Sequence, residues 1–236
     1  MARAGVFEEA GGLSFHPYAL SPKGAVELCD SLAKILAEEN SNGEIWITEI
    51  GYPTKGWFPT RVQEKNFPSH IVKTLSALAA RNVKVLFWYE LYDSKNPGEY
   101  TFTLNSESFF GIAYPNNTIK TGYNAFALCG RNLAGKEYRP ELPLRKDLPK
   151  RTVSLCFMGQ EAGNVLILWN ESGKSYHAKI TLPGRDQRVY DIGSGEYTAL
   201  KEDAEIIVTQ TPIFITWTGP ALSGQAPSVV AQKRNF

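Results

Sequence analysis

The sequence predicts an α/β region followed by an all-β region. Two observations support this fold class. Between residues 12 and 133, short apolar runs alternate with stretches of helical spacing, which is typical of βαβ units around a parallel sheet. From about residue 150 the helical spacing stops, and short strand-like runs are separated by turn segments such as GQEAGN and NESGKS. That second pattern is typical of an antiparallel β-sandwich.

The α/β elements follow one another in a regular order. The sequence predicts strands over residues 12–20, 45–50 and 83–93, and helices over residues 21–43, 62–82 and 121–133. Ser21 is the expected N-cap of the first helix and Pro22 suits its first turn. The run Ile45-Trp46-Ile47 is rich in β-formers and predicts a strand buried in a core.

The domain organisation follows from the same change in pattern. We expect an α/β domain over residues 1–135, a proline-rich charged linker over 136–149, a β-sandwich over 150–218 and a tail over 219–236.

Composition excludes several classes of function. The chain has 236 residues, and 43% of them are hydrophobic, so a folded core is expected. Its net charge is only +1, so the sequence does not predict the positively charged surface with which proteins bind nucleic acid or a membrane surface. The three cysteines, Cys29, Cys129 and Cys156, form no CxxC pair, and no GxGxxG or GxxxxGK[ST] motif is present. We therefore expect buried thiols, no metal, no cofactor, and no nucleic-acid or membrane partner. The sequence leaves the cellular compartment open.

Polar and aromatic side chains gather where the three α/β strands end. His16 and Tyr18 follow the first strand, Glu49 ends the second, and Trp88 and Glu90 end the third. In parallel sheets the carboxyl ends of the strands face the same side, and ligands bind there. The sequence therefore predicts one wall of a binding site.

These motifs carry a family resemblance. FHPY, then WITEIGYPT, then FWYELYD followed by FFGI resembles the last third of a clan A retaining glycoside hydrolase. The order is similar to strands six to eight of its TIM (β/α)8 barrel, and the nearest group is the family 39 β-xylosidases and α-iduronidases, with family 5 cellulase-like relatives as neighbours. These enzymes often carry a β-sandwich after the barrel. The resemblance thus implies the C-terminal portion of a TIM barrel followed by an antiparallel β-sandwich, and a β-linked saccharide as substrate.

The resemblance also implies roles for individual residues. Glu49 matches the catalytic nucleophile, which attacks the anomeric carbon. His16 and Tyr18 match a pair beside that carboxylate, and Trp88 matches the aromatic ring that stacks under the sugar. Glu90, just after Trp88, is a candidate to bind sugar hydroxyls.

Each candidate also has an ordinary structural interpretation. Without its neighbours, Glu49 is interpreted as a structural carboxylate paired with an arginine. His16 is alternatively a structural histidine before a proline, with its ring nitrogens hydrogen-bonded. Trp88 is alternatively a residue of the hydrophobic core. Glu90 is equally well explained as an ordinary polar residue of the loop after the third strand. Trp57 and Phe58 would line a sugar subsite or cap the rim of the barrel.

One required residue is missing from the pattern. The clan's general acid/base is a glutamate after asparagine at the end of the fourth strand, and neither Glu8 nor Glu9 fits, since Phe7 precedes Glu8. We therefore expect either a fragment of a longer enzyme or a split product whose N-terminal half of the barrel is another polypeptide, and no glycosidase activity in the isolated chain. The rival hypothesis is a non-catalytic carbohydrate-binding or scaffold protein.

Overall fold

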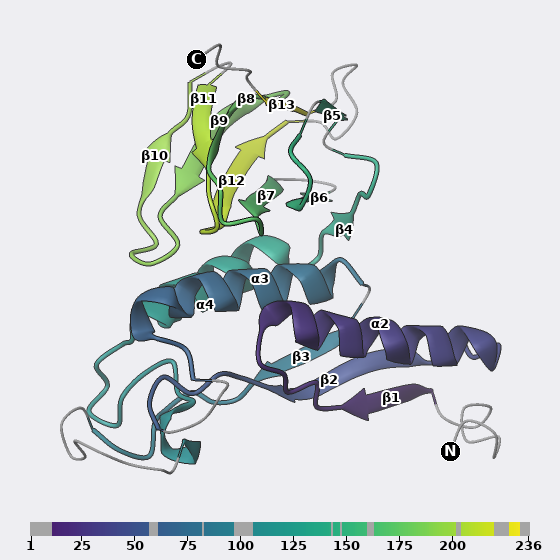
Figure 1. Cartoon of the computed structure of the whole chain (residues 1–236), viewed down its shortest axis with the longest axis vertical. Helices are drawn as coiled ribbons and strands as arrows, with labels where there is room; N and C mark the ends of the chain where they lie inside the picture. Colours follow the sequence, from purple (N-terminus) through teal and green to yellow (C-terminus); the bar gives the residue numbers. More distant parts are fainter. Residues whose placement is uncertain are drawn as a thin grey trace. The chain divides into compact units, whose positions relative to one another are not determined.

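The computed structural model describes residues 11–56, 61–81, 83–96, 106–142, 144–146, 148–159, 163–201, 204–219 and 227–231. The chain divides into two compact units, Met1–Tyr123 and Asn124–Phe236. Figure 1 shows the elements of each unit. None of the described helices is long and apolar enough to cross a membrane.

Unit 1 contains the predicted α/β elements. In chain order they are β1 (Gly12–Phe15), α2 (Pro22–Glu38), β2 (Glu44–Ile50), η2 (Glu64–Asn66), α3 (Phe67–Ala79), β3 (Val85–Trp88) and η3 (Glu107–Phe109), and α4 (Thr121–Leu133) begins at its end. Within the described residues, the strands form a parallel sheet in the order β1-β2-β3. The predicted α/β class is therefore confirmed.

The first helix begins where the sequence predicts. The Ser21 hydroxyl accepts a hydrogen bond from the backbone N–H of Gly24, and Pro22 occupies the first helical turn. This cap satisfies one of the N–H groups that the start of a helix leaves without an intrahelical acceptor. Cys29 on the same helix is buried, and all three cysteines are free and buried, as expected.

The two faces of the parallel sheet differ. Helices α2 and α3 lie on one side of it (Figure 1), the side on which Ile45 and Ile47 are 8% and 0% exposed. On the opposite face Trp46 is 42% exposed and Phe87 is 59% exposed. The prediction that Trp46 is a core residue is therefore wrong: strand alternation points it away from the helices, and its indole N–H donates to Glu44 instead.

The register between β2 and β3 contains one irregularity. Ile47 pairs with Leu86, but the next pair joins Ile50 to Trp88, so three steps along β2 match two steps along β3. A regular parallel register would have placed Trp88 beside Glu49. The extra residue in β2 therefore changes which side chains of the two strands lie together at the carboxyl end of the sheet.

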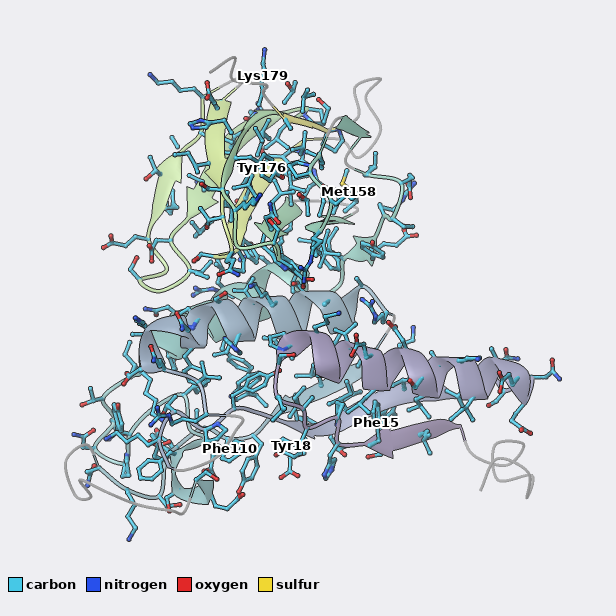
Figure 2. All side chains as sticks on the ribbon, in the orientation of Figure 1. Phe15, Tyr18, Phe110, Met158, Tyr176 and Lys179 are labelled. Atoms are coloured by element: carbon cyan, nitrogen blue, oxygen red, sulfur yellow. The ribbon has the colours of Figure 1, made fainter. Side chains whose placement is uncertain are left out.

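Unit 2 is a two-sheet β-structure, which confirms the predicted sandwich. Within the described residues one sheet has the order β10-β9-β12-β7-β6-β4 and the other β11-β8-β13-β5. The strands are β4 (Glu137–Tyr138), β5 (Leu144–Lys146), β6 (Thr152–Met158), β7 (Asn164–Asn170), β8 (Tyr176–Thr181), β9 (Arg185–Tyr190), β10 (Tyr197–Ala199), β11 (Ala204–Val208), β12 (Ile213–Thr218) and β13 (Ser228–Ala231). Leu166, Ile180 and Trp217 belong to one buried cluster with residues of both sheets. Met158, labelled in Figure 2, belongs to the same cluster.

Two segments expected to be a linker and a tail contain strands. In the segment 136–149, β4 pairs with β6 and β5 pairs with β13. In the segment 219–236, β13 also pairs with β8, and its Val229 is fully buried. Val229 reaches the core only through these long-range pairings, which the local sequence pattern does not reveal.

Candidate active site

A contact between the ends of two neighbouring strands forms the centre of the candidate site. Glu49 is the penultimate residue of β2, and His16 follows β1 directly. The imidazole Nδ1 of His16 lies 2.9 Å from Oε2 of Glu49. Because an ionised carboxylate only accepts hydrogen bonds, Nδ1 carries the proton in this contact. The Nε2 atom lies 3.1 Å from the Thr48 hydroxyl, so both ring nitrogens are engaged and the ring is held in one orientation.

Tyr18 and Glu49 line the same pocket. The pKa of the Tyr18 phenol is raised far above the usual range, first by burial and then by the negative charge of Glu49. The phenol therefore stays protonated. Figure 2 shows Tyr18 beside Phe110, and their ring centroids lie 6.0 Å apart in an edge-to-face arrangement.

A pocket of about 230 Å³ opens beside Glu49. The side chains and backbone that line it come from the ends of all three strands and the loops that follow them: Tyr18, Ala19, Glu49, Gly51, Tyr89, Glu107 and Phe110. Gly51 is required for this shape, because a Cβ atom there would lie 1.7 Å from the Tyr89 carbonyl oxygen. The lining combines carboxylates with aromatic rings, which is suited to a ligand with hydroxyl groups and flat apolar faces.

Tyr89, the residue directly after β3, lines the pocket, whereas Trp88, the last residue of β3, is not among the described lining residues. The Trp88 ring packs against Tyr52 and Phe67, with centroid distances of 6.0 and 6.2 Å. Those two partners are 1% and 0% exposed, so this is the core side of unit 1. The register irregularity explains the placement, since it pairs Trp88 with buried Ile50. Tyr89, next in sequence, lies against Phe110 at a centroid distance of 5.4 Å.

Glu90 is half-buried next to this wall and lies close to other acids. Burial is the largest cause of its raised pKa, followed by the charges of Asp93 and Glu107; Lys120 acts in the opposite direction. Among the described residues its buried Oε1 atom has no hydrogen-bond partner. Glu90 is not among the residues that line the pocket. Its backbone N–H and C=O hold the adjacent loop by bonding Phe110 and Ile112.

A buried ion pair fixes the loop that carries Phe110. The Lys120 ammonium lies 2.7 Å from Asp93 and donates to the Thr54 hydroxyl and the Phe109 carbonyl oxygen, and both charged side chains are 0% exposed. Asp93 in turn accepts from the backbone N–H of Gly111. Burial raises the pKa of Asp93 and lowers the pKa of Lys120, and their mutual contact opposes both shifts. The turn on either side of Phe110 is thus tied to one charged pair.

Sequence reasoning missed four contributors to this arrangement. Tyr89 and Phe110 stand in the motifs FWYELYD and FFGI, so their aromatic character was the available signal. Glu107 and Lys120 lie in loops without a motif, and only the fold brings them to the site. Within the described residues, no group of three His, Cys, Asp or Glu side chains is arranged to hold a metal ion. The candidates Glu8, Glu9, Trp57 and Phe58 lie outside the described residues.

The chain matches no protein-family model and no curated protein. Several solved structures have a similar fold. A family 39 glycoside hydrolase from the gut symbiont Bacteroides cellulosilyticus WH2 superposes with a TM-score of 0.68 and 18% identity, over 91% of this chain and 46% of that one. SrfJ from Salmonella typhimurium gives a TM-score of 0.50 and 12% identity, over 90% and 42% of the two chains. A conserved exported protein from Bacteroides fragilis gives 0.50 and 11%, over 87% and 46%.

These similarities establish the fold. The chain spans less than half the length of each of these structures, with 46%, 42% and 46% of them covered. The parallel β/α unit and the two β-sheets correspond to part of a glycoside hydrolase barrel and its β-domain. The predicted resemblance is therefore confirmed for the architecture.

Proposed function

Because the fold is that of part of a glycoside hydrolase barrel followed by a β-sandwich, we propose that this chain carries the nucleophile side of a retaining glycosidase site. Glu49 is the proposed nucleophile, and the bond cleaved is the O-glycosidic bond of a β-linked saccharide. The observation that carries the proposal is the carboxylate of Glu49, which contacts His16 and lines an aromatic pocket together with Tyr18.

The geometry around Glu49 suits nucleophilic attack. A retaining mechanism needs a carboxylate oriented toward the anomeric carbon, where it forms a covalent glycosyl-enzyme intermediate. His16 Nδ1 holds the carboxylate in place, and Tyr18 lines the same pocket. Its side chain is 31% exposed, so a substrate can reach it.

The aromatic wall supports a sugar ligand. Tyr89 and Phe110 line the pocket together with Tyr18, and flat rings of this kind pack against the C–H face of a pyranose. We assign the stacking role to Tyr89, since Trp88 packs on the core side. His16 and Tyr18 orient the carboxylate, and Glu90 supports the loop that carries Phe110.

Retention also needs a proton donor about 5–5.5 Å from the nucleophile. The resemblance places that acid after the fourth barrel strand, whereas Glu107 follows the strand that resembles the eighth. We therefore give Glu107 no role in proton transfer. A chain with the nucleophile alone forms the covalent intermediate only from substrates whose leaving group departs without protonation, because general acid catalysis contributes about 10²–10⁴-fold.

The test uses 2,4-dinitrophenyl 2-deoxy-2-fluoro-β-glycosides, whose leaving group needs no acid. Mass spectrometry of the treated chain should find the fluorosugar on Glu49, and Glu49→Gln should abolish the adduct. Glu44→Gln, an exposed glutamate on the same strand, is the matched control and should retain it. Simple aryl glycosides should not be turned over. Sugar binding without an adduct would instead support the non-catalytic carbohydrate-binding hypothesis, and turnover abolished by Glu49→Gln would contradict the expected inactivity.

A further inference from the structure

The side chain of Thr48 contacts the imidazole of His16 at the ring nitrogen that Glu49 does not contact. The Thr48 hydroxyl lies 3.1 Å from Nε2, whereas the Glu49 carboxylate lies 2.9 Å from Nδ1. A second hydroxyl extends the arrangement, since the Oγ atom of Ser14 lies 2.5 Å from the Oγ1 atom of Thr48. One continuous row of polar contacts therefore joins Ser14, Thr48, His16 and Glu49.

Two consecutive residues of β2 reach the same ring, which regular strand geometry does not favour. In a regular strand, neighbouring side chains point to opposite faces of the sheet. Thr48 and Glu49 lie between Ile47 and Ile50, where the register with β3 shifts by one residue. Such an irregularity interrupts the alternation of side chains. It therefore accounts for the contact of both side chains with one imidazole.

The number of available protons fixes the direction of each hydrogen bond when His16 is neutral. A neutral imidazole has one N–H group, and the contact with Glu49 requires it on Nδ1, because a carboxylate only accepts. Nε2 is then an acceptor, so the Thr48 hydroxyl donates to it. A hydroxyl has one proton to donate, so Ser14 is the donor in its contact with Thr48. All three donors thus point along the row toward the carboxylate.

The imidazole needs a second contact to keep this orientation. The side chain of His16 is 49% exposed, and an exposed polar pair gains little, because holding both side chains in one geometry costs conformational entropy. Thr48 restrains the ring at Nε2 from β2, the strand that pairs with β1. Because threonine is β-branched, its χ1 angle has few accessible rotamers, which lowers the cost of aligning its hydroxyl.

We propose that Thr48 is a positioning residue whose hydroxyl holds the His16 ring so that the Nδ1–H group points at the Glu49 carboxylate. The inference rests on the proposed function, because Glu49 is the proposed nucleophile. Loss of the Thr48 hydroxyl frees the ring to rotate into solvent, where its proton no longer has to lie on Nδ1. The carboxylate then loses the donor that orients it toward an anomeric carbon.

The first measurement is the tautomer of His16 in the full chain, from long-range 1H–15N correlation spectra at pH about 9, where histidine side chains are normally neutral. The chain has three histidines, and the His16 signals are identified by their absence from His16→Gln. The wild type should carry the proton on Nδ1. Thr48→Val should lower the ratio of the Nδ1–H to the Nε2–H tautomer by about threefold to tenfold, whereas Thr48→Ser, which keeps a hydroxyl, should retain the ratio.

The second measurement is the rate of covalent labelling of Glu49 by the fluoroglycoside at the same pH. Thr48→Val should slow labelling by about threefold to tenfold, and Thr48→Ser should restore the rate. Thr198→Val makes the same change at an exposed position of β10 and should alter neither measurement. Equal melting temperatures would show that the variants fold.

The outcomes separate the two proposals. The role of Thr48 is overturned, and the proposed function left standing, by a wild-type ring protonated on Nε2 or by a tautomer ratio that Thr48→Val leaves unchanged. A shifted tautomer with an unchanged labelling rate also overturns that role. A wild-type chain that forms no adduct overturns the proposed function, and with it the role of Thr48 in the reaction, whatever the tautomer.

Discussion

The Nδ1 atom of His16 lies 2.9 Å from the Oε2 atom of Glu49. This contact joins the carboxyl ends of β1 and β2 in a parallel sheet. Because the Nε2 atom of the same ring contacts Thr48, the imidazole bridges the last two polar side chains of β2. The orientation of the proposed nucleophile therefore depends on the pairing of the two strands.

Tyr18→Phe should slow covalent labelling of Glu49 by about tenfold or more, since it removes the proposed hydrogen-bond donor to this carboxylate, and a hydrogen bond to a charged group contributes about 1.5–3 kcal/mol. The labelling rate with the fluoroglycoside is the measurement. Tyr92→Phe removes a phenol that donates to Asn117, away from the pocket, and is the matched control. Equal rates for the two variants would rule out a role for the Tyr18 hydroxyl.

Lys120→Met should lower the free energy of unfolding by about 3–5 kcal/mol, because it leaves the buried Asp93 carboxylate without its charged partner. Urea denaturation measures this loss. Lys34→Met removes an exposed lysine paired with Glu38 and should cost less than about 1 kcal/mol. The double variant Asp93→Asn/Lys120→Met should lose less than the sum of its single variants, and strict additivity would count against a coupled pair.

Glu90→Gln should stabilise the chain at neutral pH and lose that advantage in acid. The pKa of Glu90 is raised in the folded state, so the folded state binds its proton more tightly than the unfolded state does. The free energy of unfolding of the wild type therefore falls as pH rises from the unfolded pKa through the folded pKa, and the penalty is complete above that window. Urea denaturation at pH 7 and pH 4 should show a stabilising effect of Glu90→Gln at pH 7 and a smaller one at pH 4. An effect of the same size at both values would contradict this.

Phe87→Lys should reduce self-association of the isolated chain. Parallel sheets are normally covered on both faces, whereas Phe87 is 59% exposed and Trp46 42% exposed on one face of this sheet. Sedimentation velocity over a range of concentrations should show association of the wild type that Phe87→Lys weakens. Leu28→Lys places the same charge at a 46% exposed position on α2 and serves as control. A monodisperse wild-type monomer would be evidence against an uncovered sheet face.

Local sequence determined the elements and the position of the acid within them. Alternating apolar runs and helical spacing give the βαβ order, and Ser21 starts α2 as predicted. The carboxylate at residue 49 lies at the end of a strand because the apolar run before it ends there. These features depend on near neighbours in the chain, so periodicity and capping are sufficient to predict them.

Tertiary structure decided which aromatic ring faces the pocket and which residues complete it. One additional residue in β2 pairs Trp88 with Ile50, so the Trp88 ring packs against buried Tyr52 and Phe67, and Tyr89 lines the pocket. Glu107 and Lys120 reach the site through loop contacts between residues far apart in sequence. Strand register and buried ion pairs are set by the free energy of the whole fold. The local sequence pattern therefore predicts neither of them.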